Sequence, residues 1–81
     1  MEKNNIREKE VILYTIQEVA NLLHTSPNYV YELVNSGKLK TIKIRSLKVL
    51  KDTLLEFLKR YEGMDISNIN NIKPLEVDSN E

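Results

Sequence analysis

A run of basic residues with no acidic residue among them is the feature of this sequence most able to do chemistry. Between positions 38 and 51, six side chains are cationic and none is anionic. Uncompensated Lys and Arg side chains suit polyanions, above all the phosphates of a nucleic acid. The sequence therefore predicts a phosphate-binding surface in this stretch. Its predicted members are Lys38, Lys40, Lys43, Arg45, Ser46 and Lys48, and the sixth cation of the run is Lys51.

The residue pattern places these cations on a β-hairpin. At positions 41–44 and 47–50, apolar and basic residues largely alternate, as in half-buried strands. With Arg45 and Ser46 as a two-residue loop, Lys43 would face Lys48 across the strands. Like charges in that position are destabilising, and a bound phosphate would relieve the repulsion. The alternative is that the lysines only protect a strand edge from pairing with another chain.

A second candidate surface is the polar face of a helix that precedes the hairpin. An asparagine side chain can bond adenine and a carboxylate can accept from the cytosine amino group, so this face could contact base edges in a major groove. The alternative is an ordinary solvated face of an amphipathic helix. The residues expected to point outward are Asn28, Tyr31, Glu32 and Asn35, whereas the spacing does not fix the direction of Tyr29. The predicted site on this helix consists of Ser26, Pro27, Asn28, Tyr29, Tyr31, Glu32 and Asn35.

The residues needed for other kinds of chemistry are missing or isolated. The chain has no Cys, so it can form neither a disulfide nor a thiolate metal site. His24 is the only histidine, and metal binding there is not expected. No nucleophile and base occur in a recognisable pair, and there is no glycine-rich phosphate loop. We therefore expect a non-enzymatic protein without a cofactor or a metal.

Clear capping signals delimit the two helices that must position these surfaces. Residues 15–18, Thr-Ile-Gln-Glu, form a capping box that starts a helix over 16–23. Ser26 is a good N-cap and Pro27 suits the first turn of the next helix. In that helix Val30, with apolar residues three and four positions later, predicts a buried stripe. Gly37 suits the left-handed position just after the helix end.

After the hairpin, a last helix is expected to start at Lys51 or Asp52 and to end at about Tyr61. Its apolar residues are Leu54, Leu55, Phe57 and Leu58, which we interpret as core packing. The predicted element order is thus helix, helix, strand, strand, helix. This order predicts a mainly α protein with a small β-hairpin, a winged helix-turn-helix fold.

Charge is distributed unevenly along the 81 residues, although the net charge is zero. Residues 14–61 carry eight cations and four anions, whereas residues 62–81 carry one cation and five anions. We predict an N-terminal arm at 1–13, the DNA-binding domain at 14–61, and an acidic, disordered tail at 62–81. The N-terminus is too charged for a signal peptide and no apolar run could span a membrane, so a cytoplasmic protein that associates with the nucleoid when bound to DNA is expected.

The stretch from position 14 to 58, YTIQEVANLLHTSPNYVYELVNSGKLKTIKIRSLKVLKDTLLEFL, resembles the excisionase-type DNA-binding domain. This winged helix-turn-helix is related to the mercury-resistance-regulator superfamily. The residues that carry the resemblance are Tyr14, Thr15, Glu18, Val19, Ala20, Ser26, Val30, Tyr31, Leu33, Ser36, Gly37, Lys38, Leu39, Leu54, Phe57 and Leu58. The second helix of the family usually carries Arg or Lys, but this sequence has Asn28 and Glu32 in those places. The tip at Arg45 also lacks the glycine that is frequent there, so a tight turn would strain it.

The resemblance implies a second helix in the major groove of double-stranded DNA and a wing near the adjacent backbone, with Arg45 a candidate for the minor groove. Ser26 and Tyr31 could add hydrogen bonds to phosphate. It also implies a role as an excision factor of a phage or mobile element that acts with an integrase or with further copies of itself on DNA. In free solution the protein is expected to be a monomer. The alternatives are a transcriptional regulator at an operator and a protein-interaction adaptor that does not bind DNA. The acidic tail could bind a recombinase, shield the wing or be merely solvated.

Overall fold

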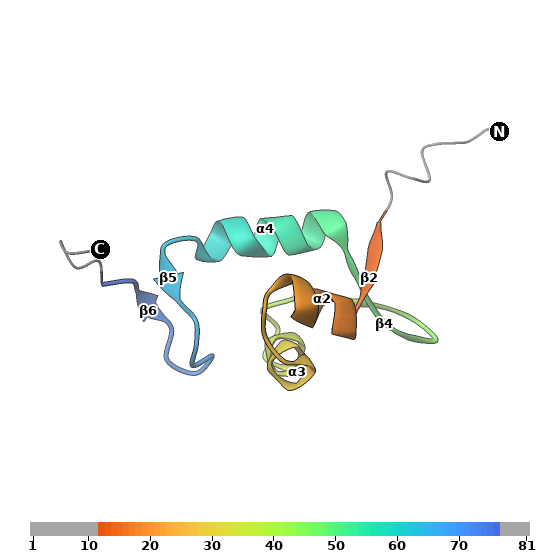
Figure 1. Cartoon of the computed structure of the whole chain (residues 1–81), viewed down its shortest axis with the longest axis horizontal. Helices are drawn as coiled ribbons and strands as arrows, with labels where there is room; N and C mark the ends of the chain where they lie inside the picture. Colours follow the sequence, from red (N-terminus) through yellow and green to blue (C-terminus); the bar gives the residue numbers. More distant parts are fainter. Residues whose placement is uncertain (1–11, 77–81) are drawn as a thin grey trace.

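The computed structural model describes residues 12–76, so the first eleven residues of the predicted arm at 1–13 and the last five residues of the predicted tail lie outside that range. The predicted core order of two helices, two strands and a third helix is confirmed, with further short strands on either side. The elements are β2 (Leu13–Thr15), α2 (Ile16–Leu22), α3 (Pro27–Asn35), β3 (Ile42–Ile44), β4 (Ser46–Leu50), α4 (Lys51–Tyr61), β5 (Met64–Asp65) and β6 (Lys73–Pro74). Figure 1 shows α4 on one side of the molecule and α3 on the other, with α2 between them.

The capping box predicted at the start of α2 is present. The Thr15 hydroxyl accepts from the Glu18 amide at 3.1 Å, and the Glu18 carboxylate accepts from the Thr15 amide at 2.8 Å. The helix ends in a left-handed turn at His24, whose φ is 59°. There the Thr25 amide donates to the Ala20 carbonyl at 2.8 Å, which closes a Schellman motif normally built on glycine.

The predicted caps of α3 are also confirmed. Ser26 is the N-cap, its hydroxyl accepts from the Tyr29 amide at 3.2 Å, and Pro27 is the first helical residue. At the other end Gly37 has a φ of 81°, and the Lys38 amide donates to the Leu33 carbonyl at 2.9 Å. Short α2, the tight turn and doubly capped α3 together fix the direction in which α3 presents its outer face.

The hairpin register differs by one residue from the register we predicted. Lys43 pairs with Leu47, not with Lys48, and Lys48 pairs with Ile42. Ile44 pairs with Ser46, so Arg45 alone forms the tip of the hairpin. A shift of one residue reverses the face of every side chain in a strand, so the predicted repulsion between Lys43 and Lys48 does not exist. Phosphate binding by the hairpin is therefore supported by the density of its cations and not by a repelling pair.

Strand β2 completes a three-stranded antiparallel sheet in the order β2-β4-β3. Leu13, which we assigned to the N-terminal arm, pairs with Leu50 in this sheet. Strand β3 is the outer strand, and its residues Ile42–Ile44 are all exposed, contrary to the half-buried hairpin expected from their alternation. Among residues 12–76 no second layer covers β3, because the core gathers around the central strand β4, where Val49 is fully buried.

One apolar core joins all three helices to the sheet. The buried side chains are Ile16, Val19, Ala20, Val30, Leu33, Leu39, Val49, Leu54, Phe57 and Ile69. On α4 the core takes Leu54 and Phe57, whereas Leu55 and Leu58 are 48% and 42% exposed and do not form the core contacts predicted for them. An α-helix buries only one stripe, and the two exposed leucines lie beside that stripe rather than on it.

The segment after α4 has a defined structure, which differs from the disorder expected for it. Strands β5 and β6 pair through Met64 with Pro74 and Asp65 with Lys73. The loop between them carries Ile69, which is 8% exposed and belongs to the core cluster. A polar, weakly patterned sequence predicts disorder because it lacks apolar surface, but a single well-placed isoleucine attaches this segment to the domain.

Candidate nucleic-acid interface

The outer face of α3 carries the polar side chains expected there. Asn28, Tyr31, Glu32 and Asn35 are all exposed, while Val30 and Leu33 on the opposite face are fully buried. At 100° per residue, Asn28, Glu32 and Asn35 cluster around one direction, and Tyr31 lies at one border of that face. Such a face can enter a major groove and present amide and carboxylate groups to base edges.

Tyr29 is turned toward the C-terminal segment instead. It is half-buried, and its hydroxyl donates a short hydrogen bond to the carbonyl oxygen of Ile66. Burial, together with the nearby carboxylates of Glu32 and Asp65, raises the pKa of Tyr29 above its ordinary value. The direction that the sequence did not fix is thus settled: Tyr29 attaches the C-terminal segment to α3.

The N-cap residue of α3, Ser26, retains a hydrogen-bond donor for a ligand. The Ser26 oxygen accepts from the Tyr29 amide, which leaves the hydroxyl hydrogen available as a donor. Ser26 is exposed and Pro27 is half-buried. A hydroxyl at a helix N-terminus is a common phosphate contact, because the helix dipole adds to the hydrogen bond.

At the tip of the hairpin, Arg45 is exposed with a φ of 69°. This left-handed conformation is unfavourable for a residue with a Cβ, as the sequence analysis expected for a tight turn without glycine. Lys48 stabilises the tip, because its Nζ donates to Ser46 Oγ at 2.8 Å and to the Ile44 carbonyl at 3.2 Å. Lys48 therefore supports the tip, and the guanidinium of Arg45 is presented at its end.

The hairpin extends beyond the helices on one side of α3, as Figure 1 shows at the right of the view. Lys40, just before β3, and Lys43 within it are exposed, and Ile42 and Ile44 of the same strand are 47% and 50% exposed. An open outer strand flanked by cations is protected from pairing with other chains, and the same cations can contact a DNA backbone.

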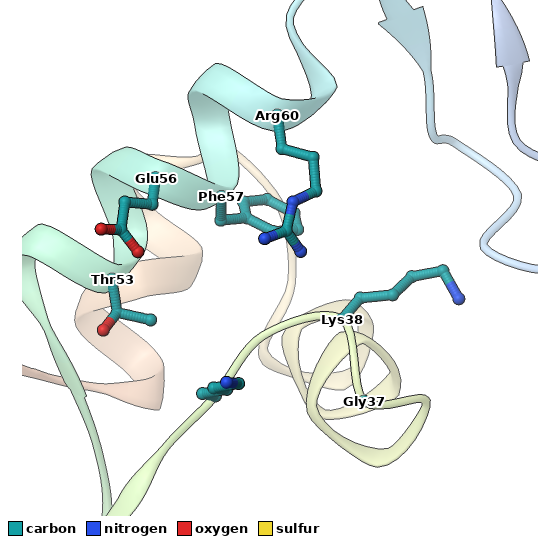
Figure 2. Close-up of a pocket in the computed structure, with 7 residues that line it drawn as sticks. Gly37, Lys38, Thr53, Glu56, Phe57 and Arg60 are labelled. Carbon is teal, nitrogen blue, oxygen red and sulfur yellow. The ribbon is translucent and has the colours of Figure 1, made fainter.

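The structure adds one cation that the sequence analysis did not select. A hollow of about 90 Å³ between α4 and the connection after α3 is lined by Gly37, Lys38, Lys40, Thr53, Glu56, Phe57 and Arg60. Figure 2 shows Arg60 reaching from α4 toward the connection that carries Lys38. In the sequence, Arg60 looks like the partner of Glu56 four residues earlier. Its position beside two lysines of the basic run depends on how α4 packs, which spacing along the chain does not reveal.

A family model described as a helix-turn-helix domain matches residues 13–61, more than half of the chain. The chain belongs to this family. The helix-turn-helix motif consists of α2 and α3, and the sheet and α4 complete the matched domain, which makes this a DNA-binding protein. Comparison with curated proteins and with solved structures gives no match.

In helix-turn-helix domains the second helix is the one that typically enters the major groove, and α3 occupies the position of that helix here. Among residues 12–76 there is no cluster of three potential metal ligands. Within the same residues, no helix is long and apolar enough to cross a membrane.

Proposed function

We propose that this protein is a sequence-specific DNA-binding factor of the excisionase type, without enzymatic activity, that biases an integrase toward excision of a phage or mobile element. The observation that carries the proposal is the pairing of an exposed polar recognition helix with a basic hairpin. The family that matches residues 13–61 includes excisionase-like proteins. The cytoplasm is the compartment in which it would meet its DNA.

In the proposed complex, α3 enters the major groove and the hairpin follows the neighbouring backbone. Asn28, Glu32 and Asn35 would contact base edges, while Ser26 and Tyr31 would bond phosphates. Lys38, Lys40 and Lys43 would contact phosphates along the hairpin, and the Arg45 guanidinium would enter the adjacent minor groove, whose negative potential attracts Arg.

This arrangement supplies a physical route to DNA bending. Cations on one side of a duplex neutralise its phosphates unevenly, and a side chain in the minor groove favours a bent path. Several copies bound side by side would add their bends, although the free protein would be monomeric. A bent attachment site brings distant integrase-binding sites together, which is the mechanical contribution expected of an excision factor.

The decisive experiment is a reconstituted excision reaction with a candidate partner integrase and a DNA carrying both of its attachment sites. We expect excision to increase when the protein is added and to fall back with the Lys43→Ala/Arg45→Ala variant. A Lys59→Ala variant, which removes one exposed cation on α4, serves as the control. Tight DNA binding without any effect on excision would contradict the proposal and would indicate an operator-binding regulator.

A further inference from the structure

The loop that joins β5 to β6 lies beside the recognition helix. A groove between them is lined by Glu32, Asn35 and Ser36 of the helix region and, on the loop, by Ser67, Asn68, Ile69 and Asn70. Two contacts hold the loop in place: the Tyr29 hydroxyl donates to the Ile66 carbonyl, and Ile69 is buried in the core. The loop is therefore a fixed neighbour of α3.

The side of α3 that the loop borders is next to the DNA-contacting face. At 100° per residue, Tyr29 and Ser36 point in nearly the same direction, and Glu32 lies between that direction and Asn28. Tyr31 lies on the opposite border. Figure 1 shows the β5–β6 loop on one side of α3 and the basic hairpin on the other. A recognition helix in a major groove has a phosphate backbone on each side, so the loop faces the strand that the hairpin does not reach.

The composition of the loop suits a phosphate backbone. Residues 66–72 contain no charged side chain, although 30% of the chain is charged. The acidic residues that follow α4 all lie outside this loop. Asp65 lies at its border, and the Asp65 carboxylate accepts a hydrogen bond from the Ser67 backbone amide at 3.0 Å. Ser67, Asn68, Asn70 and Asn71 are exposed. Serine and asparagine side chains are common donors to phosphate oxygens, whereas a carboxylate would repel them.

We propose that the loop at residues 67–71 is a second DNA-backbone contact, on the side of the recognition helix away from the basic hairpin. The inference rests on the proposed placement of α3 in the major groove. Because Glu32 borders the groove between helix and loop, the phosphates lie against the outer edge of the loop and not in that groove. The contact is made by neutral donors, so it adds affinity without releasing further counterions.

Asn70 is the best position for a test. Its backbone amide donates to the Asn68 side-chain oxygen at 3.0 Å, and substitution by Ala, Asp or Lys keeps that backbone donor. Loss of one neutral hydrogen bond in Asn70→Ala should raise the Kd for DNA about threefold, with the salt dependence unchanged. Asn70→Asp should raise the Kd more, because a carboxylate would face phosphates. Asn70→Lys should lower the Kd and steepen the slope of log Kd against log salt by about 0.9.

The matched control is the same set of substitutions at Leu55, which is 48% exposed on α4, on the other side of the molecule from α3. The body of the domain separates α4 from DNA bound at α3, and at about 0.1 M salt charge interactions are screened over about 10 Å, so the Kd should stay within about twofold. Amide exchange of residues 64–74 in each variant verifies that the segment keeps its structure.

Each result decides the inference. The inference is supported if the Kd for DNA increases from Asn70→Lys through the wild type and Asn70→Ala to Asn70→Asp, and if only Asn70→Lys changes the slope of log Kd against log salt. Equal Kd values for all Asn70 variants with an intact segment would show that the segment only braces α3, and the inference would be overturned. The same gradation at Leu55 would also overturn it, because the effect would then be one of net charge. No DNA binding by the wild-type protein at low salt would overturn both this inference and the proposed function.

Discussion

The hydroxyl of Tyr29 on α3 donates a hydrogen bond to the carbonyl oxygen of Ile66, 37 residues further along the chain. This bond connects the recognition helix to a segment that follows the last helix of the matched domain. The buried Ile69 supplies the apolar part of the same attachment. The working unit is therefore the helix-turn-helix domain together with residues 64–74.

Tyr29→Phe tests this attachment. The substitution removes one partly buried hydrogen bond and leaves the Ile66 carbonyl without its donor, so we expect the free energy of unfolding to fall by about 1 kcal/mol. Amide exchange in residues 64–74 should accelerate. Tyr31→Phe is the matched control, because Tyr31 is 44% exposed, and it should leave both quantities unchanged. Equal effects of the two substitutions would argue against the attachment.

The same hydroxyl predicts a pH dependence. Burial raises the pKa of Tyr29 in the folded protein, with Glu32 and Asp65 adding to the shift. The folded state thus holds the hydroxyl proton of Tyr29 more tightly than the unfolded state does. The contribution of Tyr29 to stability is therefore complete below the ordinary tyrosine pKa of about 10, and it is lost as pH rises through the pKa of the folded state. Urea unfolding of the wild type and of Tyr29→Phe should show a stability difference that shrinks above pH ~10. A difference that grows with pH would contradict this sign.

The local backbone signals in the sequence were sufficient to predict the first two helices. Thr15 with Glu18, Ser26 with Pro27, and Gly37 each act within one helical turn, so their geometry follows from neighbours in the chain. These signals gave the bounds of α2 and α3, whereas the hairpin and α4 were predicted in the correct order from the spacing of their apolar residues. The basic run was equally visible, because charge density does not depend on the fold.

Features that depend on distant contacts were not predictable. The hairpin register depends on whether one or two residues form the tip, and we predicted two, whereas Arg45 alone separates the paired residues Ile44 and Ser46. Strand β2 is only three residues long and gains its pairing from β4. Ile69 sits among asparagines, and nothing local shows that the core has a place for it. A weak signal did exist, because Ile66, Ile69 and Ile72 recur every third position.

His24 occupies a position that favours glycine. Its φ of 59° places it in the left-handed turn that ends α2. Removing the Cβ in His24→Gly should raise the free energy of unfolding by about 1 kcal/mol, measured by urea or thermal unfolding. His24→Ala keeps the Cβ and should give no gain. Loss of stability in the glycine variant would indicate that the histidine ring makes contacts of its own.

Arg45 combines an unfavourable backbone with the proposed minor-groove contact. Arg45→Gly should stabilise the free protein by about 0.5–1 kcal/mol because glycine accepts a φ of 69°. The same variant should bind DNA more weakly. Opposite signs for stability and affinity are the expected result, obtained from unfolding curves and DNA titrations on one preparation. An affinity equal to that of the wild type would mean that the tip does not contact DNA.

The salt dependence of DNA binding tests the central claim, that the basic hairpin contacts phosphates beside a recognition helix, most directly. The slope of log Kd against log salt is set by the number of phosphates neutralised, and each lost contact reduces it by about 0.9. We predict that Lys40→Ala/Lys43→Ala reduces the slope by about 1.8, whereas Lys59→Ala leaves it unchanged. A slope that is the same in the wild type and in the double variant would contradict the account.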